Sequence, residues 1–150
     1  MNRGQRRLAL LLRVIGVLDL LAFAAMLQPV SWLSAIHAAL QMGTFPEVPV
    51  AIYLVRSSSM LYGLCGTLLL FLSSDVARYA PAIRFIARVG LLAGGILIGI
   101  DVASRMPWWW IAVEGPACAL LWGLVWGAGR ESQLGANQLE RSTAATDNPA

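Results

Sequence analysis

Apolar residues gather in four long stretches, about residues 8–28, 50–72, 81–103 and 107–127, with short polar or proline-containing segments between them. A helix needs roughly 20 predominantly apolar residues to cross a hydrocarbon core about 30 Å thick. Each stretch has this length. Pro29 follows the first, and Pro81 and Pro107 stand at the first turns of the third and fourth, where proline is favoured. The pattern predicts an all-α integral membrane protein whose residues 1–128 form a four-helix bundle.

The segments outside these stretches differ in character. Between the first two stretches, Trp32, Leu33, Ile36 and Leu40 recur at helical spacing and Gly43 follows them. This spacing predicts a short amphipathic helix on the membrane surface. Residues 129–150 are rich in Ser, Thr, Ala, Asn and Gln and lack apolar periodicity, which predicts a disordered cytoplasmic tail.

Composition supports a lipid environment. Of the 150 residues, 58% are hydrophobic and 13% are charged, so a single soluble core cannot cover the apolar side chains. The net charge is +3, but all eleven basic residues are arginines dispersed along the chain, so we expect no nucleic-acid partner. Cys65 and Cys118 form no CxxC pair and fall in apolar stretches, which favours buried hydrophobic roles.

The distribution of arginines predicts an orientation. The segment between Pro29 and Pro49 contains no arginine. Arginines instead gather before the first stretch and around the start of the third, at Arg3, Arg6, Arg7, Arg78, Arg84 and Arg88. Because cytoplasmic loops carry the excess of Lys and Arg, both termini are expected in the cytoplasm. Trp108 to Trp110 then stand at the outer interface, as expected for aromatic residues.

Charged residues inside the apolar stretches are the most informative feature for function. At 1.5 Å per residue, Arg56 lies about 9 Å, Glu114 about 10 Å and Asp19 about 14 Å below the outer boundary. Asp101 lies near the outer end of the third stretch. Such residues usually face the bundle interior and pair with one another. We therefore expect an ion network of one arginine and two carboxylates, with a polar surround, formed by Arg56, Asp101, Glu114, Ser59, Tyr62 and Asp19.

Two interpretations of this network remain open. It is either a structural set of ion pairs that fixes helix register, or an outward-opening polar pocket for a small ligand, ion or proton. The sequence contains no nucleophile placed beside a base, no metal-ligand set and no phosphate-binding loop. His37, the only histidine, falls on the predicted surface helix. We therefore expect neither catalysis nor a metal.

A series of short motifs runs through the chain: Pro46, Pro49, Tyr53–Arg56, Tyr62–Gly63, Asp75, Arg78, Tyr79, Asp101, Pro107–Trp109 and Glu114–Pro116. Their order, over about residues 8–128, resembles the DoxX-like group of small bacterial four-helix membrane proteins. The resemblance implies the same fold and a location in the bacterial inner membrane. Some members of the wider group are associated with quinone-linked sulfur oxidation, so it also implies quinone as a possible cofactor.

Three functions follow from these features. The first is a non-catalytic accessory subunit or small-ligand binder built around the ion network. The second, from the resemblance alone, is a membrane subunit of a quinone-linked oxidoreductase. The third is a small transporter, for which four helices suffice only in an oligomer. The expected partners are the lipid bilayer and either another membrane protein or further copies of this chain.

Overall fold

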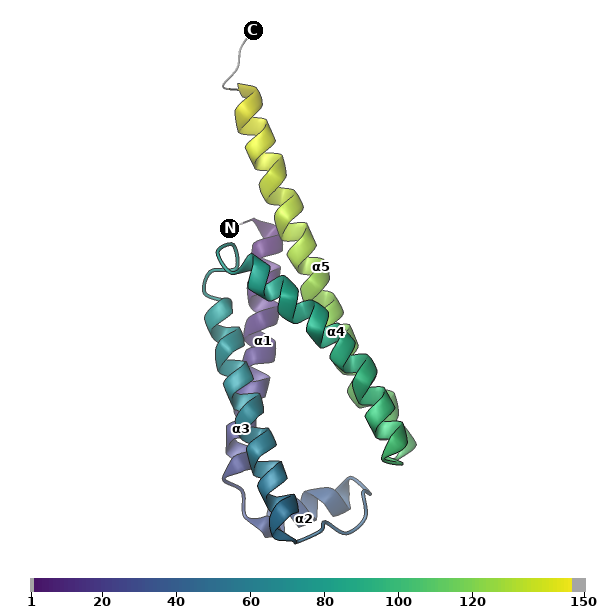
Figure 1. Ribbon diagram of the computed structural model, residues 1–150. Coiled ribbons are helices and arrows are strands. Elements are labelled where there is room, and N and C mark those ends of the chain that lie inside the picture. The colour runs from purple at the N-terminus through teal and green to yellow at the C-terminus, as the bar shows by residue number, and fades with distance from the viewer. Residues whose placement is uncertain (1, 147–150) are drawn as a thin grey trace.

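The computed structural model describes residues 2–146 and the side chains of residues 2–135. Over this range the chain forms helices and no strand (Figure 1). The elements are α1 (Arg3–Met26), α2 (Val30–Ala39), α3 (Pro49–Leu72), α4 (Ala80–Ala103) and α5 (Trp108–Thr146). Four of them, counting α5 over Trp108–Gly135, are long and apolar enough to cross a membrane. The predicted all-α class and its four apolar helices are therefore confirmed.

The surfaces of the long helices that face no other helix are apolar. Phe85 and Leu92 of α4 are 67% and 66% exposed, and Leu21 of α1 and Leu120 of α5 are 63% and 64% exposed. Water disfavours so many large exposed hydrophobic side chains, whereas lipid chains cover them without cost. These surfaces, together with the helix lengths, define the chain as a multi-pass membrane protein.

Local signals explain where the helices begin. Asn2 caps α1, because its side chain accepts a hydrogen bond from the Gln5 amide at 2.8 Å while the Gln5 side chain accepts one from the Asn2 amide at 3.0 Å. This reciprocal cap starts α1 several residues before the apolar stretch. Pro49 and Pro81 stand in the first turns of α3 and α4, where no amide donor is needed.

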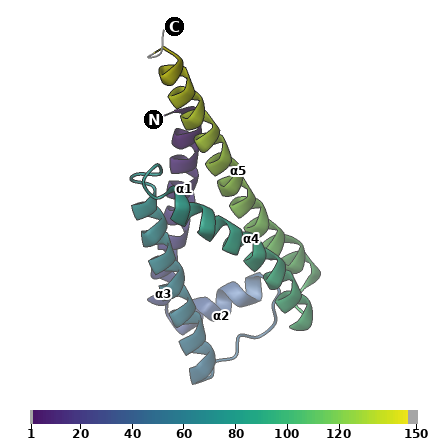
Figure 2. The same ribbon diagram turned by 45° about the horizontal axis from the view of Figure 1, so that its top comes forward.

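The long helices form two antiparallel pairs. α1 packs along α3, α4 packs along α5, and the pairs meet through α1 and α5. They lie close together where α1 begins and diverge toward the opposite side, so that the molecule has the shape of a V (Figures 1 and 2). In the part of the chain that the structure describes, α3 and α4 do not pack along their lengths. The expected closed bundle is therefore not confirmed.

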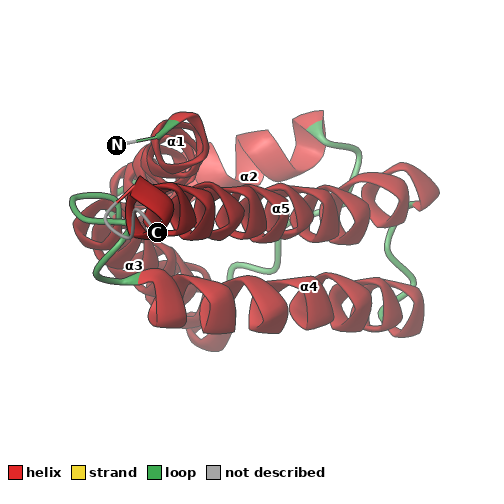
Figure 3. Cartoon of the chain, turned by 90° about the horizontal axis from the view of Figure 1, so that it is seen from above, coloured by secondary structure: helices red, strands yellow, loops and turns green. Residues whose placement is uncertain are grey.

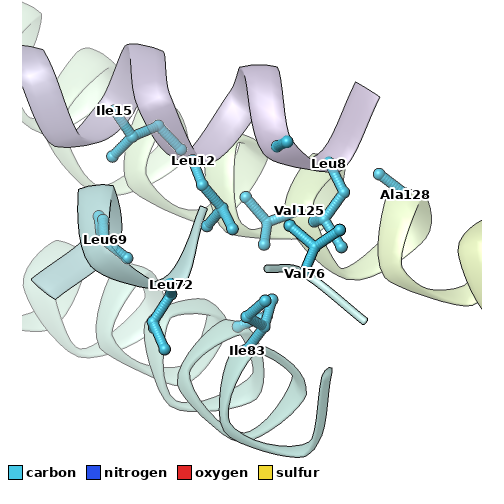
Figure 4. Close-up of a cluster of buried hydrophobic side chains, with 11 residues drawn as sticks. Leu8, Leu12, Ile15, Leu69, Leu72, Val76, Ile83, Val125 and Ala128 are labelled. Carbon is cyan, nitrogen blue, oxygen red and sulfur yellow. The ribbon is translucent and has the colours of Figure 1, made fainter. Parts of the chain in front are cut away.

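A hydrophobic core holds the vertex of the V together. Side chains from all four long helices and from the turn between α3 and α4 meet there (Figure 4). Four of them, Leu8, Leu12, Ile83 and Val125, are the largest fully buried side chains. The remaining members are Ala9, Ile15, Leu69, Leu72, Val76, Ala87 and Ala128. Burial of large hydrophobic side chains is thus concentrated at one end of the molecule.

Glycines allow each pair to approach closely. In the α1–α3 pair, a Cβ atom at Gly66 would lie 2.5 Å from the Gly16 carbonyl oxygen. In the α4–α5 pair, which runs side by side in Figure 3, a Cβ atom at Gly94 would lie 2.7 Å from the Ala119 amide nitrogen, and the Trp122 ring covers Gly90. Small residues of this kind bring helix backbones together inside membranes.

The end of α5 departs from the expected tail. Instead of ending near residue 127, α5 continues as a helix to Thr146, and residues 147–150 lie outside the described residues. Its extension packs against the start of α1: Asn2 Nδ2 donates to the Ser132 carbonyl at 3.1 Å, and Arg7 lies 3.6 Å from Glu131. The segment contains Ala, Leu, Glu and Gln, which are good helix formers, and docking on α1 adds to this propensity.

The short helix predicted between the first two spans is confirmed as α2, which lies at the open end of the V (Figure 2). It ends before two residues with left-handed backbone, Gln41 at φ 55° and Gly43 at φ 87°. Ser34 Oγ donates to the Glu47 carboxylate at 2.8 Å, which ties α2 to the loop that leads into α3.

Candidate functional site

Two rows of side chains, one along α1 and one along α5, change from apolar to acidic beyond the vertex. On α1, Leu8, Leu12 and Ile15 recur at helical spacing and Asp19 follows on the same stripe. On α5, which runs the other way, the buried Val125 leads along its stripe to Cys118 and Glu114. The stripes that form the hydrophobic core at the vertex therefore carry carboxyl groups where the pairs diverge.

Asp101 and Glu114 come together between α4 and α5. Asp101 is 4% exposed, and its Oδ2 atom has no hydrogen-bond partner. The half-buried Glu114 carboxyl group lies beside it and accepts a hydrogen bond from the Trp110 indole N–H. Ionised carboxylates only accept hydrogen bonds, so a bond between these two groups requires a proton or a donor from elsewhere. Asp101 thus carries a buried oxygen atom, Oδ2, that can accept a further hydrogen bond.

Asp19 and Tyr62 extend this group toward the α1–α3 pair. The Tyr62 hydroxyl lies close enough to Glu114 and Asp19 to interact with both electrostatically, and so does the Cys118 thiol. Tyr62 is 52% exposed and Asp19 is half-buried. We call Asp19, Asp101 and Glu114 the carboxyl cluster. Asp101 and Glu114 are neighbours, whereas Asp19 of α1 is related to Glu114 through Tyr62 and Cys118, which interact with both.

Arg56 is not part of this cluster. It is exposed and lines a groove of about 740 Å³ on the α1–α3 pair. Among the described residues, Arg7 with Glu131 is the only ion pair. The expected network of Arg56 with Asp101 and Glu114 is therefore not formed in the structure. Its prediction assumed a closed bundle in which α3 faces α4 and α5, whereas α3 packs on α1 and the other pair diverges from it.

The other predicted site residues lie either in the α1–α3 contact or near the carboxyl cluster. Ser59 is 8% exposed and lies on the face of α3 that also carries Gly63, against which the Phe23 ring packs. It therefore belongs to the α1–α3 contact. The structure places Asp101 beside Glu114, with Tyr62 and Asp19 related to Glu114 more distantly, and the use of these residues as a site stays a prediction.

Sequence reasoning missed two contacts in this region. Trp110 stands four residues before Glu114, and residues at this spacing are neighbours on a helix surface. That spacing was a usable signal for the indole–carboxylate bond. Cys118 stands four residues after Glu114 and its thiol lies 3.8 Å from the Gly90 carbonyl oxygen. Nothing in the sequence alone indicated that contact, since it joins two helices.

The cluster has the chemistry of an acceptor site. In the described part of the chain, no three His, Cys, Asp or Glu side chains gather closely enough to hold a metal ion. Carboxyl groups inside an apolar helix bundle can bind a proton, a cationic group or a hydrogen-bond donor. The aromatic rings of Trp110 and Tyr62 can add cation–π attraction.

Comparisons of the chain with protein-family models, with curated proteins and with solved structures returned no match. The DoxX-like resemblance therefore stays a prediction that rests on the motifs themselves.

Proposed function

We propose that this chain is a non-catalytic membrane protein that binds a small cationic amphiphile at the carboxyl cluster. The supporting observation is that Asp101 and Glu114 lie side by side, with an unused acceptor on Asp101, and that no arginine among the described residues pairs with them. A carboxylate in hydrocarbon is costly unless a partner satisfies it. A cationic group on an apolar body supplies that partner and remains in the membrane.

The proposal includes an orientation. The arginine distribution favours cytoplasmic termini, so the diverging ends of the helix pairs and the cluster belong to the outer half of the membrane. The resemblance favours the bacterial inner membrane. A ligand would then reach the cluster from the outer leaflet, between the two pairs.

A quinone-linked role is the second candidate, and the position of Tyr62 favours it. Its hydroxyl lies near Glu114 and Asp19 and can donate a hydrogen bond to a quinone carbonyl. A cationic ligand suits the cluster better, since three carboxyl groups present mainly acceptors. Extraction of the purified protein for bound quinone distinguishes the two roles.

The test is equilibrium binding of tetraphenylphosphonium, a lipophilic cation, to the full chain purified in detergent. We expect saturable binding that weakens about tenfold or more in Glu114→Gln and in Asp101→Asn, since each loses a charged acceptor. Glu47→Gln is the matched control, because Glu47 lies in the loop before α3 and bonds to Ser34. Equal affinity in parent and cluster variants, or no binding to the parent, would refute the proposal.

A further inference from the structure

The groove beside Arg56 is a second feature with its own chemistry. It occupies about 740 Å³ along one face of α3 and the end of α1. Its apolar wall is formed by Met26, Pro49, Ile52 and Met60. Arg56, Ser57 and Tyr53 supply its polar groups. A long apolar surface with one cationic group suits a ligand that has an anionic head and a hydrocarbon chain.

The start of α3 adds to the positive character of this groove. Pro49 is the first residue of α3, and the preceding Val48 provides no side-chain cap. Pro49 has no amide hydrogen, and the Ala51 and Ile52 amides donate to the Val48 carbonyl oxygen, so the attraction of this end for anions comes from the helix dipole. Arg56 follows Pro49 by about 10 Å along the axis at 1.5 Å per residue. Its long side chain can reach back toward that end while its stem stays in the apolar region.

Arg56 has no acidic partner among the described residues. The carboxylate nearest in sequence, Glu47, accepts a hydrogen bond from Ser34 instead. The Ser57 hydroxyl bonds to the Leu54 carbonyl at 3.2 Å within α3 and does not neutralise the charge. An unpaired guanidinium at hydrocarbon depth is costly, and a phosphate accepts two parallel hydrogen bonds from it.

We propose that this groove binds one anionic phospholipid from the leaflet at which α3 begins. The phosphate lies between the first turn of α3 and the Arg56 guanidinium. One acyl chain follows the wall formed by Ile52, Met60 and Met26. This site is distinct from the carboxyl cluster, since none of the residues that line the groove belongs to the cluster and the groove has the opposite charge.

Native mass spectrometry of the full chain with added phosphatidylglycerol or phosphatidylcholine tests the site. We expect the parent to retain phosphatidylglycerol about tenfold more strongly, and Arg56→Gln to lose this preference. Arg56→Lys keeps a positive charge and should retain part of it. Arg105→Gln is the matched control, because Arg105 is an exposed arginine in the turn between α4 and α5, away from the groove.

Two further measurements separate head-group from chain recognition. Met60→Trp fills the apolar wall and should weaken retention of both lipids. Inorganic phosphate at millimolar concentration should not displace the lipid; displacement would mean that the site recognises free phosphate, contrary to the proposal. Equal preference in the parent and Arg56→Gln, or no preference in the parent, would also overturn it.

Discussion

At the scale of single residues, glycines set how closely the helices approach. A Cβ atom added at Gly66 would lie 2.5 Å from the Gly16 carbonyl oxygen and 2.6 Å from the Leu20 amide nitrogen. These are backbone atoms, which cannot rotate away. At Gly99 the same atom would meet nothing within 4 Å. Both glycines are in apolar helices, so alanine changes helix propensity similarly at both positions. A difference between the two variants therefore reports the steric effect of the added Cβ atom at Gly66.

We predict that Gly66→Ala destabilises the protein by about 1–3 kcal/mol, as overpacking does in well-packed cores. Gly99→Ala should be neutral or slightly stabilising, since alanine is the better helix former. Thermal unfolding in detergent measures both. Equal melting temperatures for the two variants would contradict the close α1–α3 contact.

Arg105 shows local backbone strain that a substitution can relieve. It has φ 54° just after α4, a left-handed conformation that favours glycine. We predict that Arg105→Gly stabilises the protein by roughly 0.5–1 kcal/mol. Arg78→Gly, outside the positive-φ region, should instead lower the melting temperature. A drop in both variants would argue against the left-handed turn.

At the scale of elements, the sequence predicted which segments form helices, but it did not predict which helices pack against each other. Each span contains about 20 apolar residues, so its length alone identified it. The spans carry apolar residues on most faces, so periodicity could not indicate which helices touch. The partners depend on particular contacts, such as the Trp122 ring against Gly90, which join residues distant in sequence. The prediction for Arg56 depended on that missing information.

The helical extension of α5 shows the same limit. Polar composition alone indicated a tail after residue 129, whereas the helix there packs on α1 through Asn2 and Ser132. We predict that Asn2→Ala destabilises the protein by about 1 kcal/mol, because it removes both the cap and this bond. Ser132→Ala is the control, since its backbone carbonyl is the acceptor and remains. Hydrogen exchange at the first turn of α1 should rise only in Asn2→Ala; an equal rise in both variants would exclude the cap as cause.

At the scale of the whole molecule, the divergence of the two pairs separates opposite charges. The carboxyl cluster has members on α1, α4 and α5, while Arg56 belongs to a groove on the α1–α3 pair. The opposite charges that a closed bundle would bring into one ion network therefore lie in two separate places. The orientation in the membrane can be mapped independently with single cysteines in a Cys65→Ala, Cys118→Ala background.

We predict that a membrane-impermeant thiol reagent added to intact cells modifies Arg105→Cys and leaves Arg78→Cys unmodified. The two positions lie in turns at opposite ends of α4. The expected asymmetry follows from cytoplasmic termini. Modification of Arg78→Cys alone would reverse the orientation and place the carboxyl cluster in the inner half.

The most direct test of the separation between the helix pairs is a pulsed electron spin resonance distance measurement on doubly spin-labelled protein in nanodiscs. Labels at the exposed positions Leu54 of α3 and Val102 of α4 report on the open end. Labels at the exposed Leu10 of α1 and Arg130 of α5 report on the vertex. The V predicts a short distance at the vertex and, at the open end, one well beyond the 8–10 Å typical between packed helix axes. Similarly short distances at both ends would show a closed bundle and contradict the account.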